Sequence, residues 1–286
     1  MPNLAPVVSE PSLKEHVHAR GRDWVLYKGD SLDLLGRFEP QTFDVIFADP
    51  PYFLSNGGFT CQGGKRVPVG KGQWDASKGV EADHAFVKAW LAACQKLLKP
   101  SGTIWVSGTQ HVIFSVGFAM QELGYKLLNT VTWYKPNASP NLSCRYFTHS
   151  TEILLWASPG AKGKLQHLYN YAAMKQENGG KQMRDVWALP KAGEEELRAD
   201  GEGRLWSQLT PRKGEKALGG HPTQKPLRLL ERVLEASSNP DAVVLDPFCG
   251  SGTTGVAAVS MGRRFVGIDM NDAYLDLSAR RIKATR

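Results

Sequence analysis

A glycine-rich turn stands late in the sequence, at Asp246-Pro247-Phe248-Cys249-Gly250-Ser251-Gly252-Thr253-Thr254-Gly255. Its glycines have the spacing G-x-G-x-x-G, and the turn lies between a predicted strand at 243–245 and a predicted helix at 253–261. Asp269 ends the next predicted strand, where a carboxylate can accept the hydroxyls of a ribose. A plain tight turn would also use glycines, but the later acid favours a nucleoside cofactor, either NAD or S-adenosylmethionine.

The position of this turn in the chain separates those two cofactors. Only 17 residues follow Asp269, whereas a dinucleotide-binding sheet needs further strands there for its second nucleotide. The sheet must therefore be completed by strands from the N-terminal half, which brings the two ends of the chain together. This predicts a circularly permuted, doubly wound (Rossmann-like) α/β fold and favours S-adenosylmethionine over NAD.

The rest of the sequence supplies the strands that such a sheet requires. Apolar runs with helical patterns between them are typical of an α/β fold. Strands are predicted at 24–27, 43–48, 103–106, 131–134, 153–156, 243–245 and 265–268, and helices at 82–98, 111–123, 226–236 and 253–261. Residues 159–220 are polar and irregular, and they contain no repeat.

A second motif, Asp49-Pro50-Pro51-Tyr52, directly follows the predicted strand at 43–48. It therefore lies at the carboxyl edge of the sheet, where open α/β sheets bind ligands. The exocyclic amine of a base is a poor nucleophile, because its lone pair is delocalised into the ring. Asp49 and the Pro50 carbonyl can accept its two N–H bonds, prolines hold the turn, and Tyr52 offers a stacking face for a flipped-out base. A strand-ending turn is the simpler alternative.

With both motifs present, the chain resembles the β-group DNA amino-methyltransferases, and within them the DpnA-type adenine enzymes. The resemblance runs from about Trp24 to Ile282 and has the β-group order, with the catalytic motif before the cofactor loop. Four segments are similar to the DpnA type: residues 47–58 (FADPPYFLSNGG), 141–152 (NLSCRYFTHSTE), 181–187 (KQMRDVW) and 221–226 (HPTQKP). This implies methyl transfer from S-adenosylmethionine to DNA adenine N6 by direct displacement, in a restriction-modification setting.

The resemblance also implies roles for individual residues. Catalysis is assigned to Asp49, Pro50, Pro51 and Tyr52. The cofactor is expected to be bound by Asp246, Phe248, Gly250 and Gly252, with its ribose on Asp269 and its adenine ring on Asp30. The methionine end is expected against His221, Thr223 and Lys225.

Four regions are predicted along the chain. Residues 1–20 are expected to be a flexible leader, and 21–158 the catalytic half of the methyltransferase domain. An inserted target-recognition region is expected at 159–220, followed by the cofactor-binding half at 221–286. The segment from Leu189 to Gly219 is longer and more charged than the family pattern leads us to expect. The target sequence is therefore the property that the resemblance to the family predicts least well.

Charge permits a polyanionic partner, since the formal net charge is +7. We expect double-stranded DNA, with single-stranded DNA as an alternative. Its predicted contacts lie in two acid-free windows and in the recognition region, at Lys65, Arg66, Lys71, Arg145, Lys181 and Arg184.

The four cysteines are far apart in the sequence, so no metal site is expected. No 18-residue apolar run and no secretory leader is seen. This predicts a cytoplasmic, nucleoid-associated protein without a membrane segment.

Several alternatives stay open at this point. Cytosine-N4 transfer uses the same geometry on another exocyclic amine, and a DNA-binding protein without catalysis is the competing class. The similarity of Lys181 to Trp187 to the DpnA type suggests GATC as the target site. The uncharged helix at 111–123 would pack either in the core or against a second copy in a homodimer. Cys61 is interpreted as an ordinary thiol, since no base accompanies it.

Overall fold

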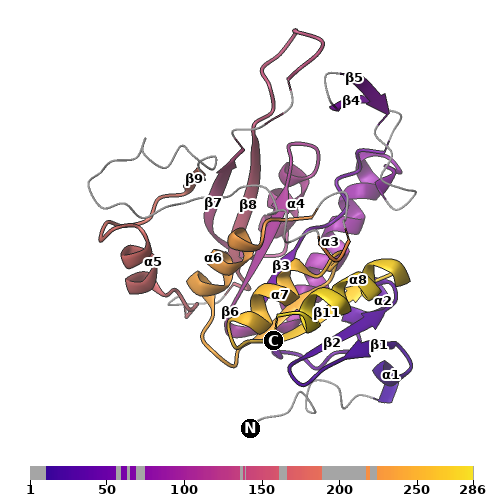
Figure 1. Cartoon of the computed structure of the whole chain (residues 1–286), viewed down its shortest axis with the longest axis vertical. Coiled ribbons are helices and arrows are strands. Elements are labelled where there is room, and N and C mark those ends of the chain that lie inside the picture. The colour runs from indigo at the N-terminus through magenta and orange to yellow at the C-terminus, as the bar shows by residue number, and fades with distance from the viewer. Residues whose placement is uncertain are drawn as a thin grey trace.

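The computed structural model describes residues 11–55, 59–62, 65–68, 75–135, 138, 140–160, 166–188, 217–219 and 224–285. These residues form a nine-stranded sheet with the order β1-β2-β11-β10-β3-β6-β8-β7-β9 and a separate hairpin, β4-β5 (Figure 1). The sheet strands are β1 (Val17–Arg20), β2 (Trp24–Lys28), β3 (Phe43–Ala48), β6 (Leu98–Gly108), β7 (Lys126–Tyr134), β8 (Thr151–Ser158), β9 (Val186–Ala188), β10 (Val243–Asp246) and β11 (Arg264–Asp269). The hairpin consists of β4 (Phe59–Gln62) and β5 (Lys65–Pro68).

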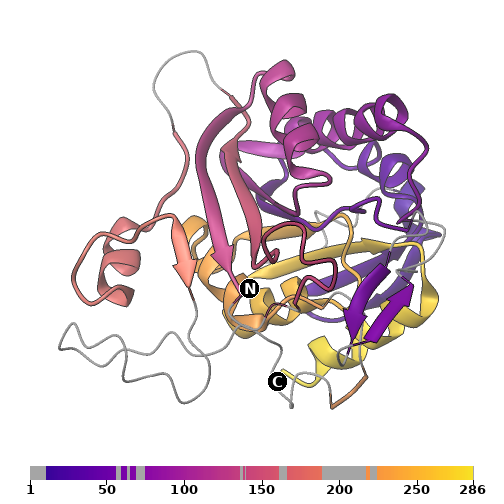
Figure 2. The same ribbon diagram turned by 90° about the horizontal axis from the view of Figure 1, so that it is seen from above.

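Helices cover both faces of this sheet, as Figure 2 shows from above. They are α1 (Pro11–Lys14), α2 (Ser31–Leu35), α3 (Val80–Leu97), α4 (Ile113–Glu122), α5 (Tyr171–Glu177), α6 (Leu227–Ser237), α7 (Thr253–Ser260) and α8 (Asp272–Lys283). Among these described helices, none is long and apolar enough to cross a membrane.

Two cores result, one on each face, because alternate residues of a strand point to opposite sides. On β3, Ile46 packs with the buried side chains of α2, α3 and α4, whereas Phe47 packs with those of α6, α7 and α8. Trp90 of α3 and Trp105 of β6 are the largest fully buried side chains of the two cores. Such two-sided burial explains the nearly continuous apolar runs of the central strands.

The permutation predicted from the glycine-rich turn is confirmed. β2, near the N-terminus, pairs in parallel with β11, near the C-terminus, from Trp24 opposite Phe265 to Lys28 opposite Asp269. β10 also pairs in parallel with β3. Strands from the two ends of the chain therefore complete one parallel sheet. β8 pairs antiparallel with β6 of this sheet, and β7 pairs antiparallel with β8.

The predicted leader at 1–20 is wrong for residues 11–20, and residues 1–10 lie outside the described part of the chain. Leu13 is fully buried in the core, and β1 pairs antiparallel with β2. His18 also lies 2.8 Å from the carboxylate of Asp276 on α8. A four-residue strand is unstable alone, and this one is ordered because it has a sheet edge to pair with.

Region 159–220 is less irregular than the sequence indicates. β9 pairs in parallel with β7 and so extends the main sheet, while Arg228 of α6 contacts Glu177 of α5 at 2.5 Å. The side-chain amide of Asn170 donates to the carbonyls of Glu235 and Ser238. The described part of this region is therefore attached to the methyltransferase sheet and to α6. Residues 189–216, which hold most of the charged segment, lie outside the described residues.

Candidate active site

The two sequence motifs meet at the carboxyl edge of the sheet. β3 and β10 are neighbours, with Val45 opposite Val244 and Ile46 opposite Leu245, so the turns that follow them lie side by side. Together they line one cavity of about 910 Å³, within the usual size of small-molecule sites. Ten of the predicted site residues line it: Asp30, Asp49, Pro50, Pro51, Tyr52, Lys225, Asp246, Phe248, Gly250 and Asp269.

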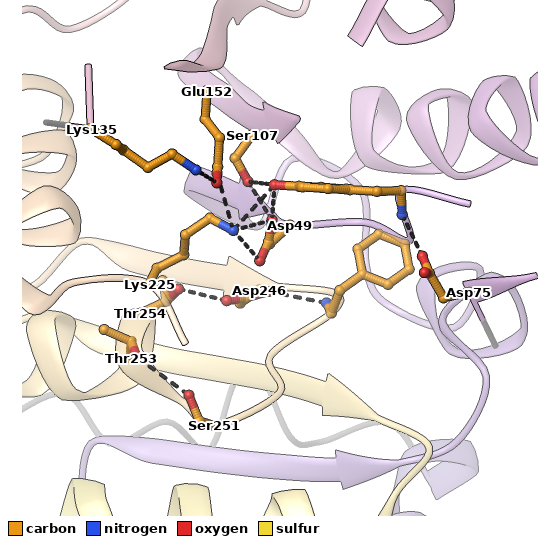
Figure 3. Close-up of polar contacts among 12 residues, drawn as sticks. Asp49, Asp75, Ser107, Lys135, Glu152, Lys225, Asp246, Ser251, Thr253 and Thr254 are labelled. Carbon is orange, nitrogen blue, oxygen red and sulfur yellow. Dashed lines mark hydrogen bonds and ion pairs between the residues drawn. The ribbon is translucent and has the colours of Figure 1, made fainter. Parts of the chain in front are cut away.

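Asp49 is held by donors from three separate segments (Figure 3). Oδ1 accepts the Tyr52 hydroxyl at 2.7 Å and the Ser107 hydroxyl, from the end of β6, at 2.6 Å. The ammonium of Lys225 donates to Oδ1 and Oδ2, both at 2.7 Å. Oδ1 thus has three donors and Oδ2 has one, which orients the carboxylate plane and leaves Oδ2 as the better acceptor for a further N–H.

Lys225 was expected at the methionine end of the cofactor, but the structure places its ammonium on the catalytic carboxylate. The side chain is 9% exposed, and its Nζ also donates to the Tyr52 hydroxyl at 3.1 Å. Glu152, at the start of β8, lies 3.6 Å away and pairs with Lys135 at 2.5 Å. Burial alone would lower the pKa of Lys225, but Asp49, Tyr52 and Glu152 raise it well above its ordinary value. Lys225 is therefore a protonated donor.

Asp75 is a site residue that the sequence analysis missed. Its side chain is fully buried and accepts the backbone N–H groups of Tyr52 at 2.8 Å, Phe53 at 2.9 Å and Leu54 at 3.1 Å. The Ser55 hydroxyl adds a fourth hydrogen bond at 3.0 Å. Phe53 has φ +57°, an unfavourable backbone angle for such a residue, which persists only where its surroundings hold it. Asp75 thus holds the turn that presents Asp49, Pro50 and Tyr52.

On the other side of the cavity, carboxylates hold the glycine-rich turn. Asp269 accepts the N–H groups of Gly250 and Asn271, each at 2.9 Å. Asp246 accepts the Phe248 N–H at 3.0 Å and the Thr254 hydroxyl at 2.5 Å. Each carboxylate oxygen has further lone pairs for a ligand.

These residues fit S-adenosylmethionine, which carries two ribose hydroxyls, a cationic sulfonium and an ammonium group. The carboxylates of Asp269 and Asp246 both line the cavity, and such groups can accept ribose hydroxyls and attract a cationic group. Phe248 packs edge-on against Trp90 and supplies an apolar wall with Phe86. The cavity therefore combines the hydrogen-bond acceptors, negative charge and apolar surface that such a cofactor calls for.

Gly252 has a structural role in place of the predicted close approach to the cofactor. Its φ is +72°, and an added Cβ would lie 2.7 Å from the Cβ of Ser278 on α8, so it faces that helix. We expect Gly252→Val to destabilise the fold by about 3 kcal/mol or more, through backbone strain and steric overlap. Thermal unfolding without ligand measures this; an unchanged Tm with weakened cofactor binding would contradict it.

The raised pKa of Asp246 leads us to expect that cofactor binding depends on pH. Burial raises the pKa of its carboxyl to about 7, so the anion that attracts a cationic ligand forms only as the pH rises through that value. We expect cofactor affinity to rise by up to about tenfold per pH unit below pH 7 and to level off above it. Isothermal calorimetry at several pH values measures this, and Asp246→Asn should flatten the profile. A profile that stays steep in the variant would assign the titration elsewhere.

The same raised pKa has a consequence for stability. Between the unfolded value near 4 and about 7, the native state binds more protons at Asp246 than the unfolded state does. The contribution of Asp246 to stability is therefore greatest at low pH and declines as the pH rises across that window. Unfolding of the ligand-free Asp246→Asn variant should lack this decline.

The predicted DNA contacts are only partly placed by the structure. Lys65 and Arg66 belong to β5, whose backbone alone is described, while Lys71, His221 and Thr223 lie outside the described residues. Arg145, Lys181 and Arg184 are exposed. Arg145 lies in the connection between β7 and β8, at the edge of the sheet where β6 ends, whereas Lys181 and Arg184 precede β9. Among the described residues, no group of His, Cys, Asp and Glu side chains is arranged to hold a metal ion.

Known proteins that are similar to this chain in sequence are DNA methyltransferases. A family model described as DNA methylase, for N6 and N4 methyltransferases, matches residues 43–280. The type II methyltransferase M2.DpnII of Streptococcus pneumoniae is 48% identical over 260 residues, covering 91% of this chain and 90% of that protein.

Two solved structures share the fold. The PvuII DNA methyltransferase (cytosine-N4-specific) has a TM-score of 0.67 and 19% identity, covering 93% of this chain and 88% of its own. The complex of M1.HpyAVI with S-adenosylmethionine has a TM-score of 0.58 and 22% identity, covering 91% and 99%. Family match, sequence identity and site geometry agree: the chain belongs to the N6/N4 DNA methylase family and is an S-adenosylmethionine-dependent DNA methyltransferase.

Proposed function

We propose that this protein methylates N6 of a flipped-out adenine at a specific DNA site. The observation that carries the proposal is the shared cavity: Asp49 and Pro50 line it together with Asp246 and Asp269, the residues that we expect to bind the cofactor. Asp at position 49 favours adenine, and the high identity to a type II methyltransferase supports a role in restriction-modification. Because its substrate is DNA, we expect the protein to act at the nucleoid.

The chain's residues act mainly by placement and electrostatics. When bound, S-adenosylmethionine supplies a sulfonium methyl group, whose C–S bond breaks with its electron pair going to sulfur. Asp49 and the Pro50 carbonyl accept the N–H bonds of the target amine, which favours a tetrahedral nitrogen with an available lone pair. Tyr52 provides an aromatic wall for the base, and Asp49 is placed to take the proton that the methylated nitrogen loses. Orientation of this kind supplies much of the rate enhancement.

The connection between β7 and β8 is proposed to contact DNA. β8 begins beside the end of β6, with Ile153 opposite Gly108, so this connection projects from the edge of the sheet that holds the site (Figure 1). Tyr146 is 61% exposed and Phe147 96%, next to the exposed Arg145. Exposed aromatic and basic side chains at this edge suit stacking against bases and pairing with phosphates.

Arg145→Ala is expected to weaken DNA binding and to reduce the slope of log affinity against log salt by about 1, since one phosphate contact is removed. Fluorescence anisotropy over a salt series measures both. Arg22→Ala is a matched control, because Arg22 is also exposed (61%) but precedes β2, at the opposite edge of the sheet. Equal slopes for wild type and Arg145→Ala would contradict the assignment.

A labelling assay tests the function itself. The protein is incubated with tritiated S-adenosylmethionine and unmethylated DNA, which is then digested to nucleosides. Label in N6-methyladenine is the expected result. Label in N4-methylcytosine would replace adenine by the alternative base, and absence of label with retained DNA binding would favour a non-catalytic binding protein.

The target site is proposed to be GATC. Support comes from the similarity of residues 181–187 to the DpnA type and from the identity to M2.DpnII. Expression in cells that lack adenine methylation, followed by sequencing for N6-methyladenine, tests this. A methylated motif without GATC would reject the site and leave the reaction intact.

A further inference from the structure

The catalytic carboxylate is accompanied by a buried hydrogen-bond donor. Lys225 Nζ lies 2.7 Å from both oxygens of Asp49, and its side chain is 9% exposed (Figure 3). Charges around it come from several elements: Asp49 after β3, Glu152 on β8, and Lys135 beyond Glu152. The site thus presents an anionic acceptor and, directly beside it, a cationic donor.

This pair is complementary to one kind of base edge. In adenine, the amine at C6 is a donor and the adjacent ring N1 is an acceptor; cytosine has the same order at N4 and N3. Guanine and thymine have the reverse order, with a carbonyl acceptor beside a ring N–H. With Asp49 facing the exocyclic group that reacts and Lys225 facing the ring nitrogen beside it, the pair matches the amino bases and opposes the keto bases. A keto base in that orientation would leave buried polar groups unpaired.

We propose that Lys225 is a specificity residue, which donates a hydrogen bond to ring N1 of the target adenine while Asp49 accepts from its N6 amine. The assignment rests on the proposed adenine-N6 function and extends it to the recognition of the base. Lys225 has three N–H donors, which now serve both oxygens of Asp49 and the Tyr52 hydroxyl. The entering amine takes the place of the Lys225 N–H on Oδ2, the less occupied oxygen, and the freed N–H turns to N1.

The surroundings hold Lys225 for this role. When one hydrogen bond to Asp49 is given up, the ammonium keeps Tyr52 at 3.1 Å and Glu152 at 3.6 Å, so it stays charged and near its position. Its charge is balanced by carboxylates on two sides. A charged donor in a buried site makes a stronger hydrogen bond than a neutral one, and its loss has a correspondingly larger effect.

The test removes the acceptor from the base. Duplexes carry adenine, 1-deazaadenine or 7-deazaadenine at the target position, opposite an abasic site so that base pairing does not enter the comparison. Single-turnover transfer is measured for each. Because 1-deazaadenine lacks N1 whereas 7-deazaadenine keeps it, we expect wild type to lose about 10- to 100-fold more rate with the former. Equal losses with the two analogues would overturn the proposal without any variant.

Variants assign this effect to Lys225. Lys225→Met should be slower on adenine but should lose no more rate with 1-deazaadenine than with 7-deazaadenine. If its transfer is too slow to measure, Lys225→Arg, which keeps a donor, should keep a larger loss with 1-deazaadenine. Lys135→Met is the matched control: Lys135 also pairs with Glu152, and this variant should keep the full wild-type difference. A full difference in Lys225→Met would overturn the proposal.

The design separates this inference from the function on which it rests. Transfer to unmodified adenine by wild type tests the proposed function alone. If the labelled base is cytosine, that function fails, and the same comparison made with 3-deazacytosine tests Lys225 against ring N3. A larger loss of rate with 3-deazacytosine than with cytosine would support recognition of an amino base by Lys225. Equal rates with the two bases would reject it.

Discussion

Asp49→Ala is expected to reduce methyl transfer by at least about 1000-fold while leaving cofactor affinity within about tenfold of wild type. Asp49 faces the target amine, and its Oδ2 is the less occupied oxygen. The cofactor is expected on Asp246 and Asp269, which belong to the neighbouring strands β10 and β11. Single-turnover rates and isothermal calorimetry measure the two effects separately. Comparable losses of rate and of cofactor affinity would contradict this division of roles.

The loss of a buried partner must be separated from the loss of catalysis. Removing one member of a buried ion pair costs about 3–5 kcal/mol, so the folded fraction of Asp49→Ala is checked by thermal unfolding, with Asp49→Asn as a second variant. Asp44→Asn is the matched control: Asp44 is on the same strand and is also paired through both oxygens, with Lys99 at 2.8 Å. It lies at the opposite end of β3, so this variant should keep its transfer rate per folded molecule.

Asp75→Ala is the second change with a large expected effect, a fall in the transfer rate of about 100-fold. The substitution removes the acceptor of three backbone N–H groups in the turn that carries Tyr52 and Phe53. The unfavourable φ of Phe53 then relaxes, and a displacement of about 1 Å at the reacting groups is enough for such a loss. Stopped-flow or quench kinetics of a single turnover measure it.

Cofactor affinity distinguishes a misplaced turn from general damage. The Asp75 carboxylate accepts its hydrogen bonds from residues 52–55, in the turn after β3, so we expect calorimetry of folded Asp75→Ala to give nearly wild-type cofactor binding. Ser55→Ala removes only the hydroxyl donor from the same carboxylate and should cost less than about tenfold in rate. An Asp75→Ala variant that is folded and fully active would show that the turn holds its own shape.

Oligomeric state stays a prediction. One face of α4 packs in the core, which is one of the two arrangements predicted for this helix. Its buried residues are Ile113, Val116, Ala119 and Met120. Phe114 and Phe118 remain exposed on the other face, with Phe118 against His84 of α3. Analytical ultracentrifugation of the protein would determine whether a homodimer forms there.

The amino-acid sequence alone determined the fold class, the order of the two halves and the two motifs that meet at the cavity. These features are local: an apolar strand followed directly by Asp49 to Tyr52, and another followed by Asp246 to Gly255, can be recognised without any knowledge of their neighbours. The order of the two motifs predicts that strands from both halves of the chain share one sheet, and β2 pairs beside β11 in it.

Tertiary structure alone decided which groups surround the catalytic carboxylate. Lys225 is 176 residues from Asp49 and lies just before α6, and Asp75 lies before α3. Ser107 reaches the site because β6 pairs with β3. No local pattern encodes a contact between side chains on different segments, and so the sequence does not reveal that the ammonium of Lys225 pairs with Asp49. The same holds for residues 11–20 and for β9, which are ordered because a neighbouring strand accepts their hydrogen bonds.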